Sequence, residues 1–323
     1  MFEPIFRNPH LATIAGNFWP RPESEAKWPV QAVVYETEPG VRVLVHSQTP
    51  LEEPKAELVL VHGLEGSSAA GYARSMVHAA LARGWVTHRF NMRGCGGTDD
   101  LAVTGYHAGQ TSDLLAFLRE RRRASPLPIF VVGFSLGGNV TLKLAGELGE
   151  AAAGLLSGVC AVSTPIDLAA CVAALGQPRN FIYQGRFLSR LKDRIRRKNR
   201  LSPDVYTLEH LPKVRSIEDF DNHYTARLFG FGTAANYFRT QSSNQFLERI
   251  RVPALLIVAK DDPLVPFRVY DHQAFKDNPF LKLLAVEHGG HLGFLSRGQS
   301  RFWLDGTVLD WAERNLAVPN DVS

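Results

Sequence analysis

Short apolar, strand-like runs alternate with longer amphipathic segments along most of the chain, and this alternation limits the fold more than any other feature. The runs ELVLVH (57–62), WVTHRF (85–90) and PIFVVGF (128–134) are each followed by a segment of helical periodicity. The second half repeats the pattern, with helices expected around 267–277 and over 302–316. Continuous apolar runs are typical of strands buried on both faces, so the sequence predicts a mostly parallel, doubly wound α/β sheet.

The alternation stops between Pro165 and Arg249, where the sequence is helical, charged and aromatic. We therefore expect three parts: an irregular N-terminal arm (1–30), an α/β core (31–164 and 250–318) and an inserted helical lid (165–249). The insertion lies between two core strands. It should cover the carboxyl edge of the sheet, where open α/β sheets bind their ligands.

The sharpest chemical signal is the pentapeptide Gly133-Phe134-Ser135-Leu136-Gly137, which lies directly between a predicted strand and a predicted helix. The small residues of this G-x-S-x-G pattern permit a tight strand-to-helix turn, which exposes the serine hydroxyl above the sheet at a helix N-terminus. Ser135 is therefore predicted to be a nucleophile. The alternative is a glycine-rich turn that serves only the close packing of the helix on the strand.

A serine nucleophile needs a base, and the base needs an acid that orients it. Lys260-Asp261-Asp262-Pro263 follows the predicted strand VPALLIVA, at the same edge of the sheet as Ser135. Asp262 is our choice for the acid because the Pro-Leu-Val-Pro that follows restrains the loop. Asp261 is the neighbouring alternative and Asp167, after an earlier strand, is a more distant one. Loop capping is the ordinary use of aspartates that are not chosen.

Two histidines follow the next predicted strand, in the sequence Glu287-His288-Gly289-Gly290-His291. His291 is favoured as the base because the glycines beside it let the backbone turn the imidazole toward Ser135. His288 lies nearer the strand end and is expected to hydrogen-bond locally. No further ligands come at metal-binding spacing, so no metal is expected. The chain order Ser135, Asp262, His291 is the order found in α/β-hydrolases.

An oxyanion hole would complete such a site. His62-Gly63-Leu64-Glu65-Gly66 ends the strand ELVLVH, and its glycines let backbone N–H groups turn toward the nucleophile. The expected donors are the backbone N–H groups of Leu64 and Leu136. The alternative for this segment is a tight turn between strand and helix with no catalytic part.

The net charge of +4 is concentrated in one segment. Residues 186–200 hold eight basic residues and one acid, Asp193, so this segment carries +7 and the rest of the chain −3. A single basic helix with no interleaved aromatic side chains to stack on bases is a poor match to a nucleic-acid-binding surface. We therefore expect no nucleic-acid partner. We expect a solvated helix with its apolar face (Phe187, Leu188, Leu191, Ile195) against the fold. The alternative is a weak peripheral contact of residues 186–200 with an anionic membrane, or attraction to acidic substrates.

Several classes of protein are excluded by composition. Three widely spaced cysteines (Cys95, Cys160, Cys171) with no C-x-x-C pair argue against a disulfide framework and a zinc knuckle. The first residues lack the apolar run of a signal peptide, and no run of about 18 apolar residues could cross a membrane. We therefore expect a cytoplasmic protein.

These motifs together resemble those of the YheT-like family of α/β-hydrolases, bacterial relatives of the eukaryotic abhydrolase-domain lipases and of yeast medium-chain alcohol acyltransferases. The resemblance implies an α/β-hydrolase fold and a carboxylic-ester hydrolase with Ser135 as nucleophile, Asp262 as orienting acid and His291 as base. The motifs that carry it span nearly the whole chain in the family's order: FRNPHLATI (6–14), HGLEGSS (62–68), NMRGCGG (91–97), YHAGQTSDL (106–114), GFSLGGN (133–139), FDNHYTARLFGF (220–231), KDDPLVP (260–266) and EHGGHLGF (287–294).

We therefore predict a serine esterase or lipase that uses no cofactor and cleaves a small-molecule acyl ester through an acyl-enzyme. Two alternatives stay open: an alcohol acyltransferase with the same triad, and a non-catalytic binding module on a hydrolase scaffold. Short to medium acyl chains are expected, because the lid offers aromatic side chains to cover a chain (Phe181, Tyr183, Phe187, Phe229, Phe231, Tyr237, Phe238).

Overall fold

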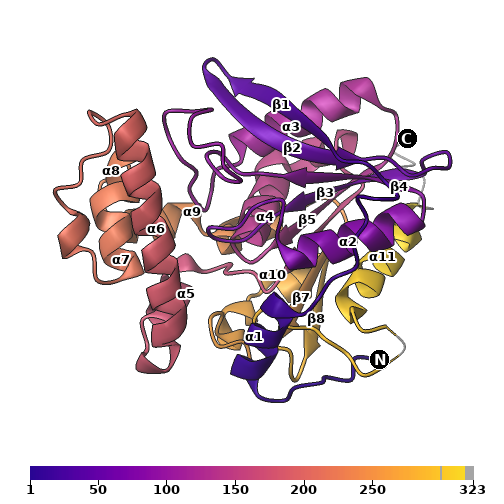
Figure 1. The fold of residues 1–323 in the computed structure, drawn as a ribbon. Helices are drawn as coiled ribbons and strands as arrows, with labels where there is room; N and C mark the ends of the chain where they lie inside the picture. Colours follow the sequence, from indigo (N-terminus) through magenta and orange to yellow (C-terminus); the bar gives the residue numbers. More distant parts are fainter. Residues whose placement is uncertain (299, 317–323) are drawn as a thin grey trace.

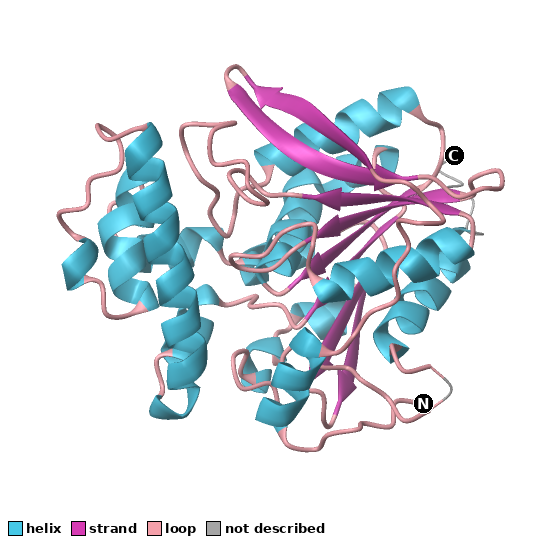
Figure 2. Cartoon of the chain, viewed as in Figure 1, coloured by secondary structure: helices cyan, strands magenta, loops and turns pink. Residues whose placement is uncertain are grey.

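An eight-stranded sheet covered by helices on both faces forms the body of the protein in a computed structural model, which describes residues 1–298 and 300–316 (Figure 1, Figure 2). The strand order is β1-β2-β4-β3-β5-β6-β7-β8. The β1–β2 and β2–β4 pairs are antiparallel, and every other neighbouring pair is parallel, which confirms the predicted sheet. The strands are β1 (Gln31–Glu38), β2 (Val41–Gln48), β3 (Ala56–Val61), β4 (Trp85–Phe90), β5 (Ile129–Phe134), β6 (Gly158–Val162), β7 (Ala254–Ala259) and β8 (Leu281–Val286).

Two apolar layers hold the helices on the sheet. Helices α2 (Gly71–Ala82) and α11 (Trp303–Leu316) pack in the layer on one face, and α3 (Ser112–Ala124) and α4 (Leu136–Leu148) pack in the layer on the other (Figure 1). Every residue of the inner strands β3 to β7 is buried, which explains why their sequences are mostly apolar. The main polar exceptions lie on β3 and β4, where the buried Glu57 and His88 side chains contact each other at 3.1 Å. No described helix is long and apolar enough to cross a membrane.

One helix expected from the sequence is wrong. The single helix expected around 267–277 is divided into a 3₁₀ turn (Phe267–Tyr270) and the short helix α10 (Ala274–Asp277). Between them the His272 side chain accepts the N–H of Ala274, and such local side-chain bonds compete with a continuous helix. The terminal helix α11 agrees with the prediction, whereas residues 317 and 318 of the expected core lie outside the described residues.

The N-terminal segment is not wholly irregular, because residues Pro9–Phe18 form helix α1. The Asn8 side chain accepts the N–H groups of His10 and Leu11, and proline stands at the first helical position, both strong helix-start signals. This cap is a local signal that argues against the expected irregular arm. Gly16 packs α1 against the chain after β8: a Cβ at this position would lie 2.6 Å from the Cα of Gly293.

Between β6 and β7 the chain forms only helices and loops, beside the sheet at the left of Figure 1. We call residues 165–249 the helical region. It has an apolar cluster of its own, built from residues such as Leu191, Tyr206 and Phe220. Its helices are α5 (Leu168–Leu175), α6 (Phe181–Leu201), α7 (Ile217–Phe220), a π-helical turn (Asp221–Thr225), α8 (Ala226–Leu228) and α9 (Ala234–Gln241).

The basic segment lies on α6, and the expectation that its charges are solvated is wrong for two residues of the C-terminal half. Arg194 and Lys198 are buried. The Lys198 ammonium donates to the backbone carbonyls of Asp99 and Ala102, both at 2.6 Å, and burial lowers the pKa of Lys198 to about 8. Arg197 pairs with the Asp99 carboxylate at 2.8 Å. These side chains tie α6 to the loop after β4.

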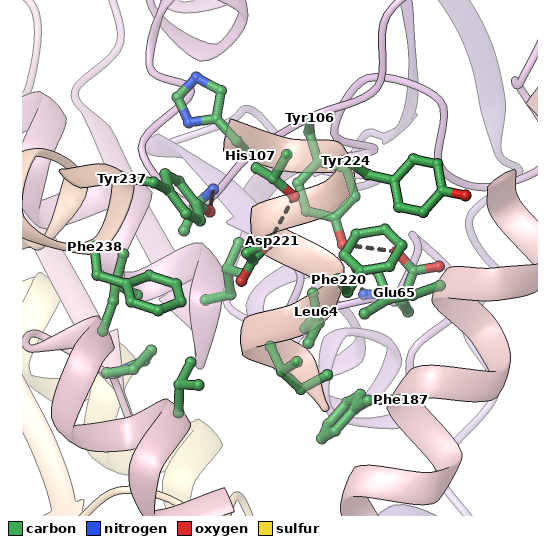
Figure 3. Close-up of a pocket in the computed structure, with 18 of the residues that line it drawn as sticks. Leu64, Glu65, Tyr106, His107, Phe187, Phe220, Asp221, Tyr224, Tyr237 and Phe238 are labelled. Carbon is green, nitrogen blue, oxygen red and sulfur yellow. Dashed lines mark hydrogen bonds between the residues drawn. The ribbon is translucent and has the colours of Figure 1, made fainter. Parts of the chain in front are cut away.

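A buried carboxyl group begins the π-helical turn. Asp221 accepts a hydrogen bond of 2.6 Å from the Thr225 hydroxyl, and its side chain faces a cavity beneath the helical region (Figure 3). Burial raises the pKa of Asp221 from 3.8 to about 7, because the low-dielectric surroundings disfavour the charged form.

We expect Asp221→Asn to remove part of the pH dependence of stability. Below pH about 4 the carboxyl is protonated in both states. Between pH about 4 and pH about 7, Asp221 loses its proton in the unfolded chain but keeps it in the native state. The free energy of unfolding therefore falls as the pH rises through this range. Asparagine keeps an acceptor for Thr225 but cannot titrate. Urea unfolding at pH 5 and pH 8 should show a smaller fall for the variant; an equal fall in both proteins would contradict the assignment.

Candidate active site

Ser135 occupies the sharp turn between β5 and α4, with φ 51° and ψ −121°. Its N–H donates to the carbonyl of Val162 on the neighbouring strand at 2.8 Å. Only glycine fits two residues before and two residues after Ser135. A Cβ on Gly133 would lie 2.3 Å from the carbonyl oxygen of Gly137, and a Cβ on Gly137 would lie 2.3 Å from the carbonyl oxygen of Val61. The strained turn is thus enforced by the close packing of α4 on β3 and β5.

The structure brings Ser135, His291 and Asp262 together from three separate loops. The Nε2 of His291 lies 2.9 Å from the Ser135 Oγ, and its Nδ1 lies 2.8 Å from an Asp262 carboxylate oxygen. The His291 and Asp262 side chains are 9% and 2% exposed. This geometry lets one ring nitrogen accept the serine proton while the other donates to the buried carboxylate.

Asp262 is held by the loop that follows it. Its second carboxylate oxygen accepts the backbone N–H groups of Leu264 at 2.8 Å and Val265 at 3.0 Å. These bonds fix the carboxylate before any substrate binds. The Pro-Leu-Val-Pro segment was expected to restrain the loop, and two of its N–H groups bond the Asp262 carboxylate directly.

The alternative residues have other partners. Asp261 lies 3.2 Å from the His288 ring and accepts the N–H groups of Gly289 and Gly290 at 3.0 and 2.9 Å. Asp167 caps α5 by accepting the N–H of Ala170. Asp261 and His288 therefore shape the loop that carries His291 and do not contact Ser135.

Helix α1 holds the backbone of His291 from the opposite end of the chain. The Thr13 hydroxyl accepts the His291 N–H at 2.9 Å and donates to the Pro9 carbonyl at 2.7 Å. The next residue, Leu292, has a φ of 59° and donates its N–H to the Ser163 hydroxyl at 3.3 Å. Thr13 could not be identified from the sequence, because no local pattern links residue 13 to residue 291.

The segment after β3 lies against the nucleophile, since a Cβ on Gly63 would be 3.1 Å from the Cβ of Ser135. Its neighbours are tightly bound: the Gly63 N–H donates to the Tyr72 hydroxyl at 3.0 Å, and the Glu65 N–H donates to the Tyr106 hydroxyl at 2.8 Å. The N–H groups of Leu64 and Leu136 have no acceptor among the described residues. They are available to a negatively charged oxygen near Ser135.

His62 fixes the start of this segment. Its Nδ1 donates to the Gly63 carbonyl at 2.8 Å, and its Nε2 accepts the Met92 N–H at 3.1 Å. Burial lowers the pKa of His62 to about 4, so the ring is neutral and its tautomer is set by these two bonds.

A buried ion pair links the same segment to the helical region. Arg194 of α6 contacts both carboxylate oxygens of Glu65, at 3.0 and 3.3 Å, and its guanidinium lies 4.5 Å from the centroid of the Tyr106 ring. The Arg194 and Glu65 side chains are 9% and 4% exposed. The sequence offered one signal for this pair: Arg194 falls beside Ile195 on the predicted apolar face of its helix.

A mostly apolar cavity extends from Ser135 and His291 beneath the helical region (Figure 3). Of the seven aromatic side chains expected to cover an acyl chain, four line this cavity: Phe187, Phe229, Tyr237 and Phe238. Tyr183 lines a neighbouring groove that also reaches Ser135. Phe231 packs against His107 and Tyr237, and Phe181 is 69% exposed on the outer surface.

Metal ligands do not gather around the nucleophile. Within the described chain, no group of three His, Cys, Asp or Glu side chains could hold a metal ion. The cysteines Cys95, Cys160 and Cys171 are buried, and burial raises the pKa of each thiol.

Comparison with known proteins places the chain among hydrolases. The model of the alpha/beta hydrolase family matches residues 58–302. The chain is 35% identical over 278 residues to YheT of Escherichia coli (strain K12), a protein provisionally named as an esterase; the match covers 83% of this chain and 80% of that one. It is 30% identical over 262 residues to the monoacylglycerol lipase of Saccharomyces cerevisiae, covering 78% of this chain and 58% of the lipase.

A solved structure shares the fold. The esterase Pf2001 of Pyrococcus furiosus superposes with a TM-score of 0.60 at 16% identity, covering 91% of this chain and 98% of the esterase.

We expect Arg194→Met to destabilise the protein by about 3–5 kcal/mol, because it leaves the Glu65 carboxylate buried without its cation. Arg196→Met is the matched control, since Arg196 pairs with Asp193 on the same helix and both side chains are half exposed; it should cost less than about 0.5 kcal/mol. Urea unfolding measures both. Adding Glu65→Gln to Arg194→Met should restore part of the loss, and equal effects of the two arginine variants would contradict the argument.

Proposed function

Because this chain belongs to the α/β hydrolase family, and within it to the YheT-like proteins, we propose that it cleaves carboxylic esters with Ser135 as nucleophile. The observation that carries the proposal is the unbroken hydrogen-bonded chain from the Ser135 hydroxyl through the His291 ring to the Asp262 carboxylate. The names of the relatives, an esterase and a monoacylglycerol lipase, agree with ester substrates.

In the proposed reaction, the Ser135 oxygen attacks the ester carbonyl while His291 takes its proton. The N–H groups of Leu64 and Leu136 stabilise the negative charge on the tetrahedral intermediate. His291 then protonates the leaving alcohol, which leaves an acyl-enzyme, and in the second half it activates the water that releases the acid. Asp262 keeps the imidazole in the required tautomer and stabilises its protonated form.

We assign the acyl group to the cavity beneath the helical region, which acts as a lid. Most of the side chains that line it are apolar, among them aliphatic ones such as Leu168, Val172 and Leu175. Burial of a short to medium acyl chain here would stabilise the complex by about 0.8 kcal/mol per methylene group. No cofactor enters this mechanism.

The experiment that tests the proposal is hydrolysis of p-nitrophenyl esters from acetate to palmitate by the wild-type protein and Ser135→Ala. We expect an optimum at a short or medium chain and a loss of kcat of at least about 10⁴-fold in the variant, since the nucleophile is removed. A variant that retained full activity would overturn the serine mechanism. Inactivity of both proteins on every ester would favour a binding module instead.

Two adjacent aspartates allow the assignment of the acid to be tested separately. Asp262→Asn should lower kcat by about 10⁴-fold, because the amide no longer holds the catalytic tautomer of His291. Asp261→Asn should lower it less than tenfold, since Asp261 contacts His288 and backbone N–H groups and not the His291 ring. Equal losses would contradict the assignment.

The acceptor of the acyl group is tested in the same assay by adding ethanol. Hydrolysis predicts that the free acid stays the main product. Accumulation of the ethyl ester in preference to the acid would identify an alcohol acyltransferase that uses the same three side chains.

A further inference from the structure

The opening that leads to Ser135 lies between two helices that meet at its rim. Ile14 and Phe18 of α1 and Tyr183 and Phe187 of α6 line this groove, with Ser135 at its base. The helices are in contact, since the His10 ring lies 3.1 Å from the Tyr183 hydroxyl and the Arg186 guanidinium lies 5.7 Å from the centroid of the Phe18 ring. What surrounds this rim decides what can approach the nucleophile.

Large apolar side chains project into solvent around the rim. Five of the fourteen exposed large apolar residues in the described chain belong to α1 and the first turn of α6: Leu11 (54% exposed), Ile14 (43%), Phe18 (70%), Phe181 (69%) and Ile182 (61%). Single exposed apolar residues are ordinary, but a cluster at the mouth of a site indicates a binding surface.

The two chain segments that form the rim helices carry charge of one sign. Residues 7–19 and 176–192 contain no Asp or Glu, and they carry five cations: Arg7, Arg179, Arg186, Arg190 and Lys192. None of these five forms an ion pair with a carboxylate of the described residues. In the C-terminal half of α6, by contrast, Arg194, Arg196 and Arg197 are each paired with an acid. Most of the basic side chains of the C-terminal half of α6 are thus held by partners, Arg200 being an exposed exception, whereas Arg186 and Arg190 beside the opening have no carboxylate partner among the described residues.

We propose that this surface, formed by the outward faces of α1 and the N-terminal half of α6, binds the anionic lipid surface of a membrane and holds the opening to Ser135 against it. We call it the α1–α6 surface. Apolar side chains can enter the acyl boundary while arginines contact anionic headgroups, as for amphipathic helices that lie in the interface. A second copy of the chain fits less well, because a twofold contact would place like charges against each other.

The consequence is that an ester can pass from the lipid surface into the groove without crossing water. This consequence rests on the proposed ester hydrolysis, whereas the binding itself does not. The membrane contact considered from the sequence extended over all of residues 186–200. The α1–α6 surface leaves out the C-terminal half of α6 and adds α1.

Binding is measured with the full-length Ser135→Ala protein, which leaves the lipids intact, by co-sedimentation with vesicles of phosphatidylcholine alone or mixed with phosphatidylglycerol. We expect binding to the mixed vesicles only, weakened at high salt. The variant Leu11→Ser/Phe181→Ser/Ile182→Ser, whose residues line neither the groove nor the cavity, should bind at least tenfold more weakly. Arg179→Glu/Arg186→Glu should do the same.

Matched controls lie on the other side of the molecule. Val33 and Val34 on β1 are exposed apolar residues, and Arg119 and Arg123 on α3 are exposed cations. Val33→Ser/Val34→Ser and Arg119→Glu/Arg123→Glu should bind mixed vesicles as the parent does. Equal weakening by surface and control variants, or no preference of the parent for anionic vesicles, would overturn the proposal.

Two further measurements separate the alternatives. A dimer in light scattering that the apolar triple variant converts to a monomer would identify the surface as a contact between copies and overturn lipid binding. With Ser135 restored, the triple variant should hydrolyse a water-soluble p-nitrophenyl ester like the wild type but lose at least tenfold on an ester embedded in mixed vesicles. Absent hydrolysis of both esters would refute the proposed function while the vesicle-binding result still stands by itself.

Discussion

The packing of α4 against β3 and β5 is the constraint on which the site depends. Because the backbones meet at Gly133 and Gly137 with no space for a side chain, the chain must reverse within one residue, and Ser135 takes up the strain with a positive φ. The reversal lifts the hydroxyl above the sheet and starts a helix directly behind it, so the free N–H of Leu136 lies beside the nucleophile. Any looser turn would separate these two groups.

A second set of contacts holds the other loops against this turn. Residues far from Ser135 in the sequence hold the backbone segments around it. Thr13 accepts the N–H of His291, Tyr72 that of Gly63 and Tyr106 that of Glu65. The ion pair between Glu65 and Arg194 extends this support to the helical region. The Leu64 donor of the proposed oxyanion hole is therefore positioned by Tyr72, by Tyr106 and by the helical region, while α1 positions the backbone of His291.

The basic side chains in the two halves of helix α6 have different surroundings, which the composition of the helix does not reveal. In its C-terminal half, Arg194, Arg197 and Lys198 fasten the helical region to the core through the carboxylates of Glu65 and Asp99 and through backbone carbonyls. Its N-terminal half leaves its arginines unpaired beside the opening. The basic side chains of residues 186–200 thus fall into two groups. One group holds the helical region on the core, and the other has no carboxylate partner among the described residues.

Local patterns were sufficient to predict the sheet and the turn at Ser135, because strand burial and glycine spacing depend on neighbouring residues. Loop position also led to Asp262 and His291, whose side chains the structure brings together with Ser135 and whose catalytic roles are part of the proposed function. Asn8 and Pro9 are likewise a local signal for the start of α1, although this segment was expected to be irregular. What only the tertiary structure decided is which side chains meet across long separations. Thr13 reaches residue 291, and Arg194 leaves solvent only because Glu65, 129 residues away, neutralises it in a buried site. Burial of a charge depends on its partner, and no local pattern records where that partner will lie.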